Sequence, residues 1–235
     1  MLSNWRRRFV SILLVSLLLA SGALAQVAGY NDNFGYNYLY FGSYPQGANG
    51  EVAPIIWRVL GVEDNVAYLM SEYLLFAARV HGDQRNYPSF EQSELNGRLN
   101  SEFFDAAFTD EDKAAMVLNE ELGYVSLPSV DDLRNKAFGF KKNSDYFFVG
   151  TPYALNNGLF RYSSKKYSPI WTRTKSTKKH ANRSTKVDGA IGFIGVESAD
   201  LGITPVIWLD LGKVEVVSGA GTLDAPFTLN IIQNE

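Results

Sequence analysis

The residues best suited to bind a charged ligand lie in one segment of the sequence, residues 146–187. This segment has nine Lys and Arg residues and no Asp or Glu, with His180 and several aromatic rings among them. Guanidinium and ammonium groups form strong hydrogen bonds with carboxylate, sulfate and phosphate groups. We therefore expect a ligand-binding loop at residues 173–186, between two strands, with candidate contacts Arg173, Lys175, Lys178, Lys179, His180, Asn182 and Arg183. The alternative is a lysine-rich loop that is only solvated.

Catalytic chemistry has few candidate residues. The chain has no cysteine, which excludes thiol nucleophiles, thiolate metal sites and disulfides. It has two histidines, His81 and His180, and no serine in a G-x-S-x-G turn. A glycosidase needs two carboxylates, and the adjacent acids at residues 120–121 and 131–132 lie where turns and helix caps explain them. We expect no enzyme, with a polysaccharide hydrolase as the less favoured alternative.

A metal site or cofactor is not expected either. Asp188, Glu197 and Asp200 lie close enough in sequence for loop carboxylates to hold calcium. Acidic residues in such a region are more often turn residues, and the sequence favours that interpretation.

The first 25 residues have the pattern of a secretory signal peptide. Three arginines precede an apolar run of about a dozen residues, and Ala23-Leu24-Ala25 fits a cleavage site. Cleavage after Ala25 leaves residues 26–235, which we expect to form one domain without a transmembrane segment. That chain has 19 basic and 25 acidic residues, a net charge near −6, which argues against nucleic-acid binding. The expected location is the periplasm, the cell surface or the medium.

The pattern of apolar residues and turn signals predicts an α+β fold. Residues 26–36 resemble a loose leader, and a strand is expected at 38–41. A hairpin is predicted from strands 55–62 and 66–71, in which Arg58 and Tyr68 need polar partners. Helices are expected to begin at Ser89, Thr109, Ser129 and Thr151, where capping residues occur. Strands follow at 170–174, 190–196, 206–211, 213–217 and 227–232. Strands, then helices, then strands indicate an antiparallel sheet.

The sequence around each tryptophan indicates whether its ring is expected in the hydrophobic core. Trp57 and Trp208 lie within apolar strand patterns and are expected in the core. Trp171 lies at the centre of the basic segment, where it is either a core ring or a platform for a ligand. The core position is favoured.

Short motifs in fixed order resemble those of a bacterial family of secreted proteins, a domain-of-unknown-function family. They are FGSYPQ at residues 41–46, WRVL at 57–60, LMSEYL at 69–74, SEL at 93–95, VSLPS at 125–129, TPYA at 151–154, PVIWL at 205–209 and G-x-G-T-x-x-x-P-F at 219–227. The match that these motifs define extends over nearly all of residues 26–235. Two positions depart from the family pattern: Lys175 stands where it has proline, and Thr204 where it has arginine.

This family is similar in layout to C-type-lectin-like domains of the formylglycine-generating-enzyme type. The resemblance implies two short sheets flanked by helices, with a long loop region that bears the ligand. Formylglycine-generating enzymes need a cysteine pair and the related sulfoxide synthases need three histidines, and this chain has neither.

The sequence therefore predicts an exported, non-catalytic binding module for an acidic glycan or another polyanion. The alternative is a structural or protein–protein interaction module that uses the aromatic residues Tyr36, Tyr38 and Tyr40.

Overall fold

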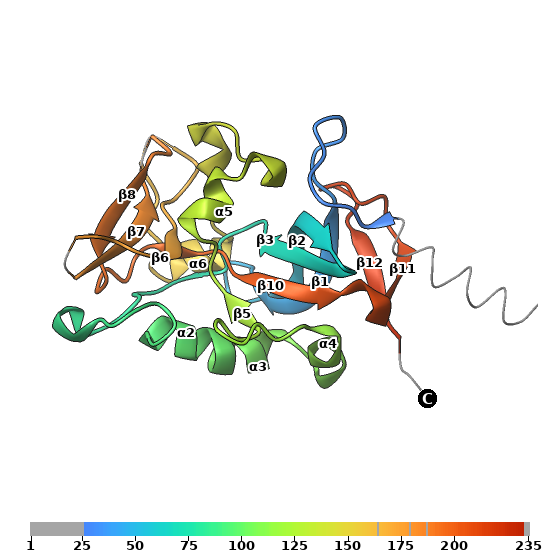
Figure 1. Cartoon of the computed structure of the whole chain (residues 1–235), viewed down its shortest axis with the longest axis horizontal. Coiled ribbons are helices and arrows are strands. Elements are labelled where there is room, and N and C mark those ends of the chain that lie inside the picture. Colours follow the sequence, from blue (N-terminus) through green and yellow to red (C-terminus); the bar gives the residue numbers. More distant parts are fainter. Residues whose placement is uncertain (1–25, 164, 179, 187, 233–235) are drawn as a thin grey trace, which may run out of the picture.

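The computed structural model describes residues 26–163, 165–178, 180–186 and 188–232 (Figure 1). The expected signal peptide and Lys179 lie outside these ranges. A seven-stranded sheet forms the centre of the described chain, in the order β11-β12-β1-β2-β3-β10-β5. Its strands are Val214–Ser218 (β11), Phe227–Ile231 (β12), Tyr38–Pro45 (β1), Val52–Glu63 (β2), Val66–Ser71 (β3), Val206–Asp210 (β10) and Val125–Ser126 (β5). Neighbouring strands are antiparallel except β1 and β12, which are parallel.

The predicted hairpin is confirmed as β2 and β3, and its side chains alternate between two faces. Ile55, Trp57 and Val59 point into the larger hydrophobic cluster. Asp64 and Asn65 form the turn with φ of 47° and 66°. Two successive residues with positive φ give a turn whose twist matches that of the flanking strands.

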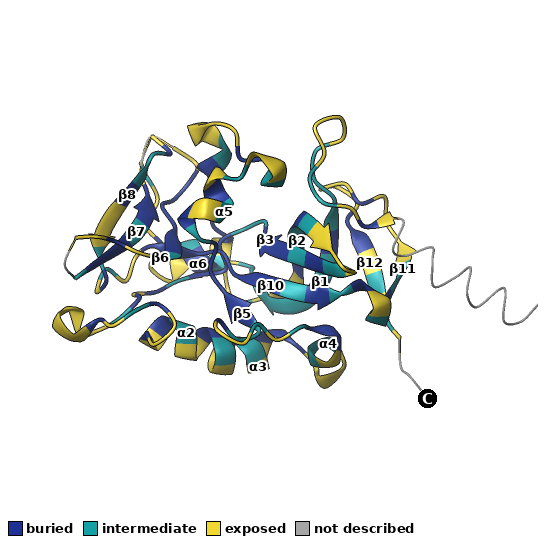
Figure 2. Cartoon of the chain, viewed as in Figure 1, coloured by how far each residue is buried: buried dark blue, intermediate teal, exposed yellow. Residues whose placement is uncertain are grey.

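Helices cover the large hydrophobic cluster on one side of the sheet (Figures 1 and 2). They are Glu94–Arg98 (α2), a π-helical turn Leu99–Phe103, Phe104–Ala107 (α3) and Asp110–Ala115 (α4). The predicted apolar row of Leu95, Leu99, Phe103 and Ala107 is buried, as expected.

The predicted start of the first of these helices at Ser89 is wrong. The N-cap is Ser93, whose hydroxyl accepts a hydrogen bond from the amide of Asn96. Phe90 is buried before the helix begins, and residues 91–92 form a turn that leads to the N-cap. The caps predicted at Thr109, Ser129 and Thr151 are confirmed; the last two begin Val130–Arg134 (α5) and Pro152–Asn156 (α6).

Two smaller sheets complete the described chain. Trp171–Lys175 (β6), Ala181–Thr185 (β7) and Ile191–Gly195 (β8) form a three-stranded sheet at one end of the molecule, and Phe76–Ala77 (β4) pairs with Gly202–Ile203 (β9). The long loop expected at residues 173–186 is therefore wrong, because β7 occupies much of it. β7 consists mainly of small and polar residues, so no apolar alternation marked it as a strand.

The other face of the central sheet carries a second hydrophobic cluster and a buried ion pair. Arg58 bonds to Glu72, with 2.6 Å between Nη2 and Oε2, and the two side chains are 12% and 14% exposed. Tyr36 and Phe148 pack against the guanidinium, with ring centres 4.9 Å and 5.7 Å from Cζ. This confirms that Arg58 needed a polar partner. Burial raises the pKa of the Glu72 carboxyl above its ordinary value, although the Arg58 charge acts in the opposite direction.

The N-terminal segment is not a loose leader. Val27 is buried in the large cluster, and the Tyr36 hydroxyl donates a hydrogen bond of 2.7 Å to Phe138 O. The fold is α+β with mostly antiparallel sheets and short helices, as predicted, but with a large sheet and two small ones instead of two short sheets. Across the part of the chain that the structure describes, every helix falls short of the length and apolar character that crossing a membrane requires.

Candidate ligand-binding site

The predicted contacts do not form one basic loop, because two of them point into the protein. Asn182 is fully buried in β7, and its amide donates a hydrogen bond of 2.6 Å to Thr172 O. Arg173 is mostly buried in β6, with a side chain 20% exposed. Trp171, in the same strand, is fully buried and donates from its indole to Ala78 O, which confirms the core interpretation.

Two further predicted contacts hold another segment of the chain in place. Lys175 Nζ donates a hydrogen bond to Pro88 O, and the Nδ1 of His180 donates to Gln84 O. His180 lies in the β6–β7 turn with a positive φ of 60°. These side chains fasten residues 84–88 to the three-stranded sheet, so their first role is structural.

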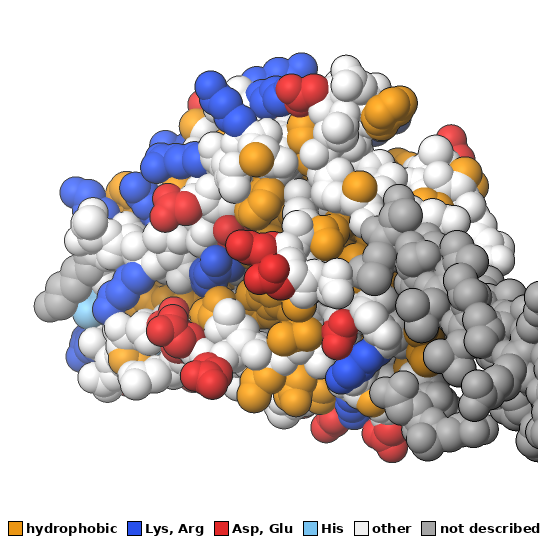
Figure 3. Space-filling view, turned by 45° about the vertical axis from the view of Figure 1, so that its right-hand side comes forward, with side chains coloured by type: hydrophobic (Ala, Val, Ile, Leu, Met, Phe, Trp, Pro, Cys, Tyr) orange, Lys and Arg blue, Asp and Glu red, His pale blue; other side chains and the backbone are white. Residues whose placement is uncertain are grey.

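Lys178 and Arg183 are the described candidates left without a strong internal partner. Lys178 is exposed in the turn, and Arg183 is half-buried on β7, opposite Phe193 of β8. Within the described part of the chain, the Arg183 guanidinium forms one long hydrogen bond, 3.5 Å to Gly192 O. On the face shown in Figure 3, many basic side chains lie at the upper and left margins, and acidic side chains lie beside apolar ones near the middle and along the lower side.

Arg173 leads to a different site. Its Nη1 forms an ion pair of 2.9 Å with Asp132 Oδ2 and donates to Leu127 O at 2.6 Å and to the Tyr68 hydroxyl at 3.3 Å. The Tyr68 hydroxyl in turn donates to Asp132 Oδ2 at 2.9 Å. Tyr68 thus has the polar partners that the sequence required, in a network that joins β3, α5 and β6.

This network forms one wall of an open hollow of about 570 Å³ on the second face of the central sheet. Tyr68 and Trp208 are cross-strand neighbours on β3 and β10, and their rings stack at 5.4 Å with an angle of 25°. Phe138 packs against Tyr68 at 5.8 Å from the opposite side. Other residues that line the hollow are Gly61, Val62, Glu63, Asp64, Val66, Asp132 and Arg173.

Gly61 explains how Phe138 reaches the sheet. A Cβ at this position would lie 3.1 Å from Phe138 Cε1, closer than ordinary van der Waals contact. The glycine thus leaves room for a ring where any larger residue would displace it. The last aromatic wall of the hollow depends on this small residue in β2.

The polar atoms of the hollow are only partly satisfied within the protein. Asp132 Oδ2 accepts from Tyr68, Arg173 and the backbone amide of Ser129, but Asp132 Oδ1 has no partner among the residues described here. The same holds for Nε and Nη2 of Arg173. Burial raises the pKa of the Tyr68 phenol, with a further contribution from the Asp132 charge. The hydroxyl therefore stays protonated and can donate. Stacked rings beside a free carboxylate oxygen and free guanidinium N–H groups are suited to bind a small polar molecule.

The sequence did not identify most of this site. Trp208 was assigned to the core, but it is half-buried and forms a wall of the hollow. Asp132 was assigned to a cap, and it does cap α5, but it also bonds to Tyr68 and Arg173. Two signals in the sequence pointed here: the need of Tyr68 for a polar partner, and Arg173, a predicted ligand contact that lines the hollow.

The calcium alternative gains no geometric support. In residues 26–232, leaving aside the undescribed positions, no three acidic or histidine side chains come together as a metal site would require. Asp188 accepts a hydrogen bond from the Ala190 amide, as a turn residue does.

Comparison of the chain with family models, with curated proteins and with solved structures found no match.

Proposed function

We propose that this protein is an exported carbohydrate-binding module whose hollow, lined by Trp208 and Tyr68, holds a saccharide ring. The observation that carries the proposal is the half-buried Trp208–Tyr68 pair beside polar atoms that have no partner among the described residues. A saccharide ring has an apolar C–H face and a rim of hydroxyl groups. An aromatic wall suits the face, and the free atoms of Asp132 and Arg173 suit the hydroxyls.

The hollow is arranged for binding before a ligand arrives. Asp132 is fixed by Tyr68, Arg173 and the start of α5, and Arg173 is fixed by Leu127 O as well. Side chains that are already ordered lose little conformational entropy when a ligand binds. This supports a binding role. We propose that the protein binds its ligand without catalysing a reaction.

A C-type-lectin-like fold and export to the cell envelope belong to the same proposal. The parallel pairing of β1 with β12 brings the two ends of the described chain together, and helices flank the main sheet on both sides. These features are compatible with a lectin-like domain. The signal-peptide pattern of residues 1–25 supports export.

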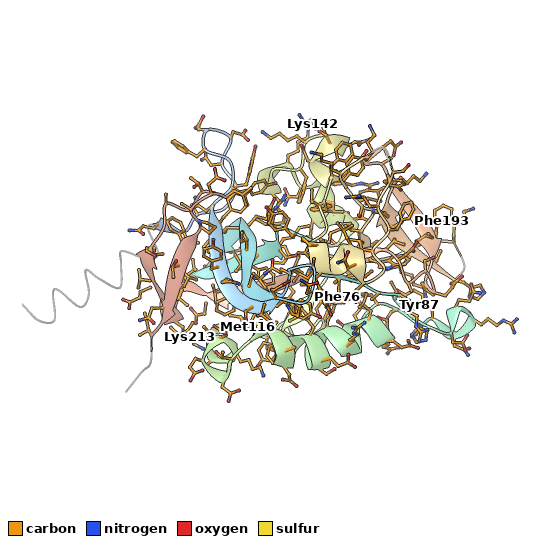
Figure 4. All side chains as sticks on the ribbon, turned by 180° about the vertical axis from the view of Figure 1, so that it is seen from behind. Phe76, Tyr87, Met116, Lys142, Phe193 and Lys213 are labelled. Carbon is orange, nitrogen blue, oxygen red and sulfur yellow. The ribbon has the colours of Figure 1, made fainter. Side chains whose placement is uncertain are left out.

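The proposal is tested by calorimetric titration of the purified protein with neutral, acidic and amine-bearing oligosaccharides. Trp208→Ala removes the aromatic wall, and we expect it to weaken saccharide binding at least about tenfold, or about 1.4 kcal/mol. Phe193→Ala is the matched control. Phe193 is an exposed ring on β8, far from the hollow at the end of the molecule (Figure 4), and its removal should leave the affinity unchanged.

Two results would overturn the proposal. One is that no oligosaccharide of the panel binds; the other is that Trp208→Ala binds as tightly as the wild type. Thermal unfolding of both variants establishes that each is folded during the titration.

A further inference from the structure

We infer that the saccharide bound in the Trp208 hollow carries a free, protonated amine. This inference rests on the proposed function and names the class of ligand at the same site. It differs from the acidic glycan that the basic segment of the sequence predicts. The charges that line the hollow carry the argument.

The lining of the hollow has a net negative charge. It includes the three carboxylates of Glu63, Asp64 and Asp132 and one cationic group, the guanidinium of Arg173, so the net formal charge is −2. Arg173 lies in an ion pair with Asp132, which offsets its charge. An anionic sugar would be repelled by the carboxylates of Glu63 and Asp64 at the rim. The one cationic group in the lining, Arg173, is already paired with Asp132.

The two rim carboxylates are held in place by the hairpin and are free to meet a ligand. Glu63 is the last residue of β2, and Asp64 is the first of the two turn residues with positive φ. Both are exposed, and neither forms an ion pair within the described ranges of the chain. Lys136 precedes Phe138 by two residues, but it lines a separate hollow with Tyr30 and Lys141.

The aromatic walls act in the same direction as the carboxylates. The face of an aromatic ring is negative, and cations are attracted to Trp and Tyr faces within about 6 Å. Tyr68, Trp208 and Phe138 place three rings around the hollow. An ammonium group on the sugar would gain from the rings, from Asp132 Oδ1 and from the rim charges together. A hydroxyl or an acetamide at the same position gains only hydrogen bonds.

The test compares two ligands that differ at one group, oligomers of glucosamine and oligomers of N-acetylglucosamine. Titrations are made at mildly acidic pH, where the amine is protonated and the carboxylates are ionised. We expect the wild type to bind the amine form about tenfold more tightly at low salt. The preference should shrink as salt is added, because salt screens exposed charges.

Charge variants locate the preference. Glu63→Gln with Asp64→Asn removes both rim charges and should reduce the preference for the amine form several-fold. Glu120→Gln with Glu121→Gln is the matched control, because these exposed acids lie in another turn and do not line the hollow. The control should keep the full preference.

The outcomes separate the two proposals. Equal affinity for the two oligomers, or tighter binding of an acidic oligosaccharide that is lost in Trp208→Ala, overturns the amine inference and leaves carbohydrate binding at the hollow intact. Absence of binding to every saccharide overturns both.

Discussion

At the scale of single residues, the buried pair of Arg58 and Glu72 shows most clearly how a charged group in a strand is accommodated. The guanidinium lies between the rings of Tyr36 and Phe148, and the carboxylate lies 2.6 Å from it. Burial raises the pKa of Glu72 despite the nearby positive charge, which indicates that removal from water costs the carboxylate more than Arg58 returns. Tyr38, the cross-strand neighbour of Arg58, has a pKa raised to about 12 by the same burial.

This pair predicts opposite effects for single and double substitutions. Glu72→Ala leaves the Arg58 charge buried without a partner and should lower the free energy of unfolding by about 3–5 kcal/mol. Arg58→Met combined with Glu72→Leu removes both charges and should restore most of that loss. Urea unfolding at neutral pH measures both.

The exposed pair of Arg79 and Glu94 is the matched control for this prediction. Its side chains are 54% and 48% exposed with atoms 3.2 Å apart, so Glu94→Ala should cost less than about 1 kcal/mol. A double variant at residues 58 and 72 as unstable as Glu72→Ala would contradict the argument.

Residue types alone gave the correct burial for Trp57 and Trp171 but not for Trp208. Trp57 and Trp208 occur in apolar strand patterns, whereas Trp171 lies at the centre of the basic segment. Trp208 alternates with Ile207 and Leu209, which fill the large cluster, so its ring points to the opposite face. Whether that face is covered depends on where α5 and Phe138 lie, and this depends on tertiary packing that a local pattern does not contain.

At the scale of elements, the π-helical turn between α2 and α3 is explained by one side chain, Asn100. Its Nδ2 donates to Val125 O at 2.8 Å and to Leu122 O at 3.2 Å, and its Oδ1 accepts from the Val125 amide at 3.0 Å. Asn100 thereby fastens the start of β5 to the helix.

We expect Asn100→Ala to lower the free energy of unfolding by about 2–4 kcal/mol, because several backbone groups lose their partner inside the protein. Ser101→Ala is the control. Ser101 is exposed on the same turn and its hydroxyl donates only to Gly97 O, so a change within about 0.5 kcal/mol is expected. Similar stability of the two variants in urea unfolding would show that Asn100 does not have this role.

Elements with strong local signals were predicted well, and those without them were missed. The β2–β3 hairpin has a β-branched pattern and turn residues, and three of the four predicted caps are correct. β7 has neither signal: its buried residues are Ala181, Asn182, Ser184 and Thr185. β7 is stabilised by its pairing with β6 and β8. The residues of β7 alone do not predict this pairing.

At the scale of the whole molecule, the separation of charge along the sequence does not become one basic surface. Lys175 and His180 are used to hold residues 84–88, Arg173 is paired inside the hollow, and Asn182 is buried. Lys178 and Arg183 are the described members of the predicted set that have no strong partner within the described chain. Binding of an acidic glycan at the β6–β7 hairpin therefore stays a prediction, and it now depends on fewer groups.

The two surfaces can be distinguished by one experiment. Lys178→Glu with Arg183→Glu reverses two charges of the hairpin that have no strong internal partner, and neither residue lines the hollow. If the hairpin binds polyanions, this variant should lose binding to an acidic oligosaccharide by at least about tenfold, and the wild-type affinity should fall steeply with salt. Binding of neutral or amine-bearing sugars in the hollow should not change, since neither residue lines it. Lys213→Glu is the control, because this half-buried lysine, whose Nζ donates to Ala114 O, lies at the opposite end of the molecule (Figure 4), and a charge reversal there should leave polyanion binding intact. Acidic-glycan binding that is equal in the wild type and the hairpin variant would exclude the hairpin as its site, whereas equal loss in both variants would show that only net charge matters.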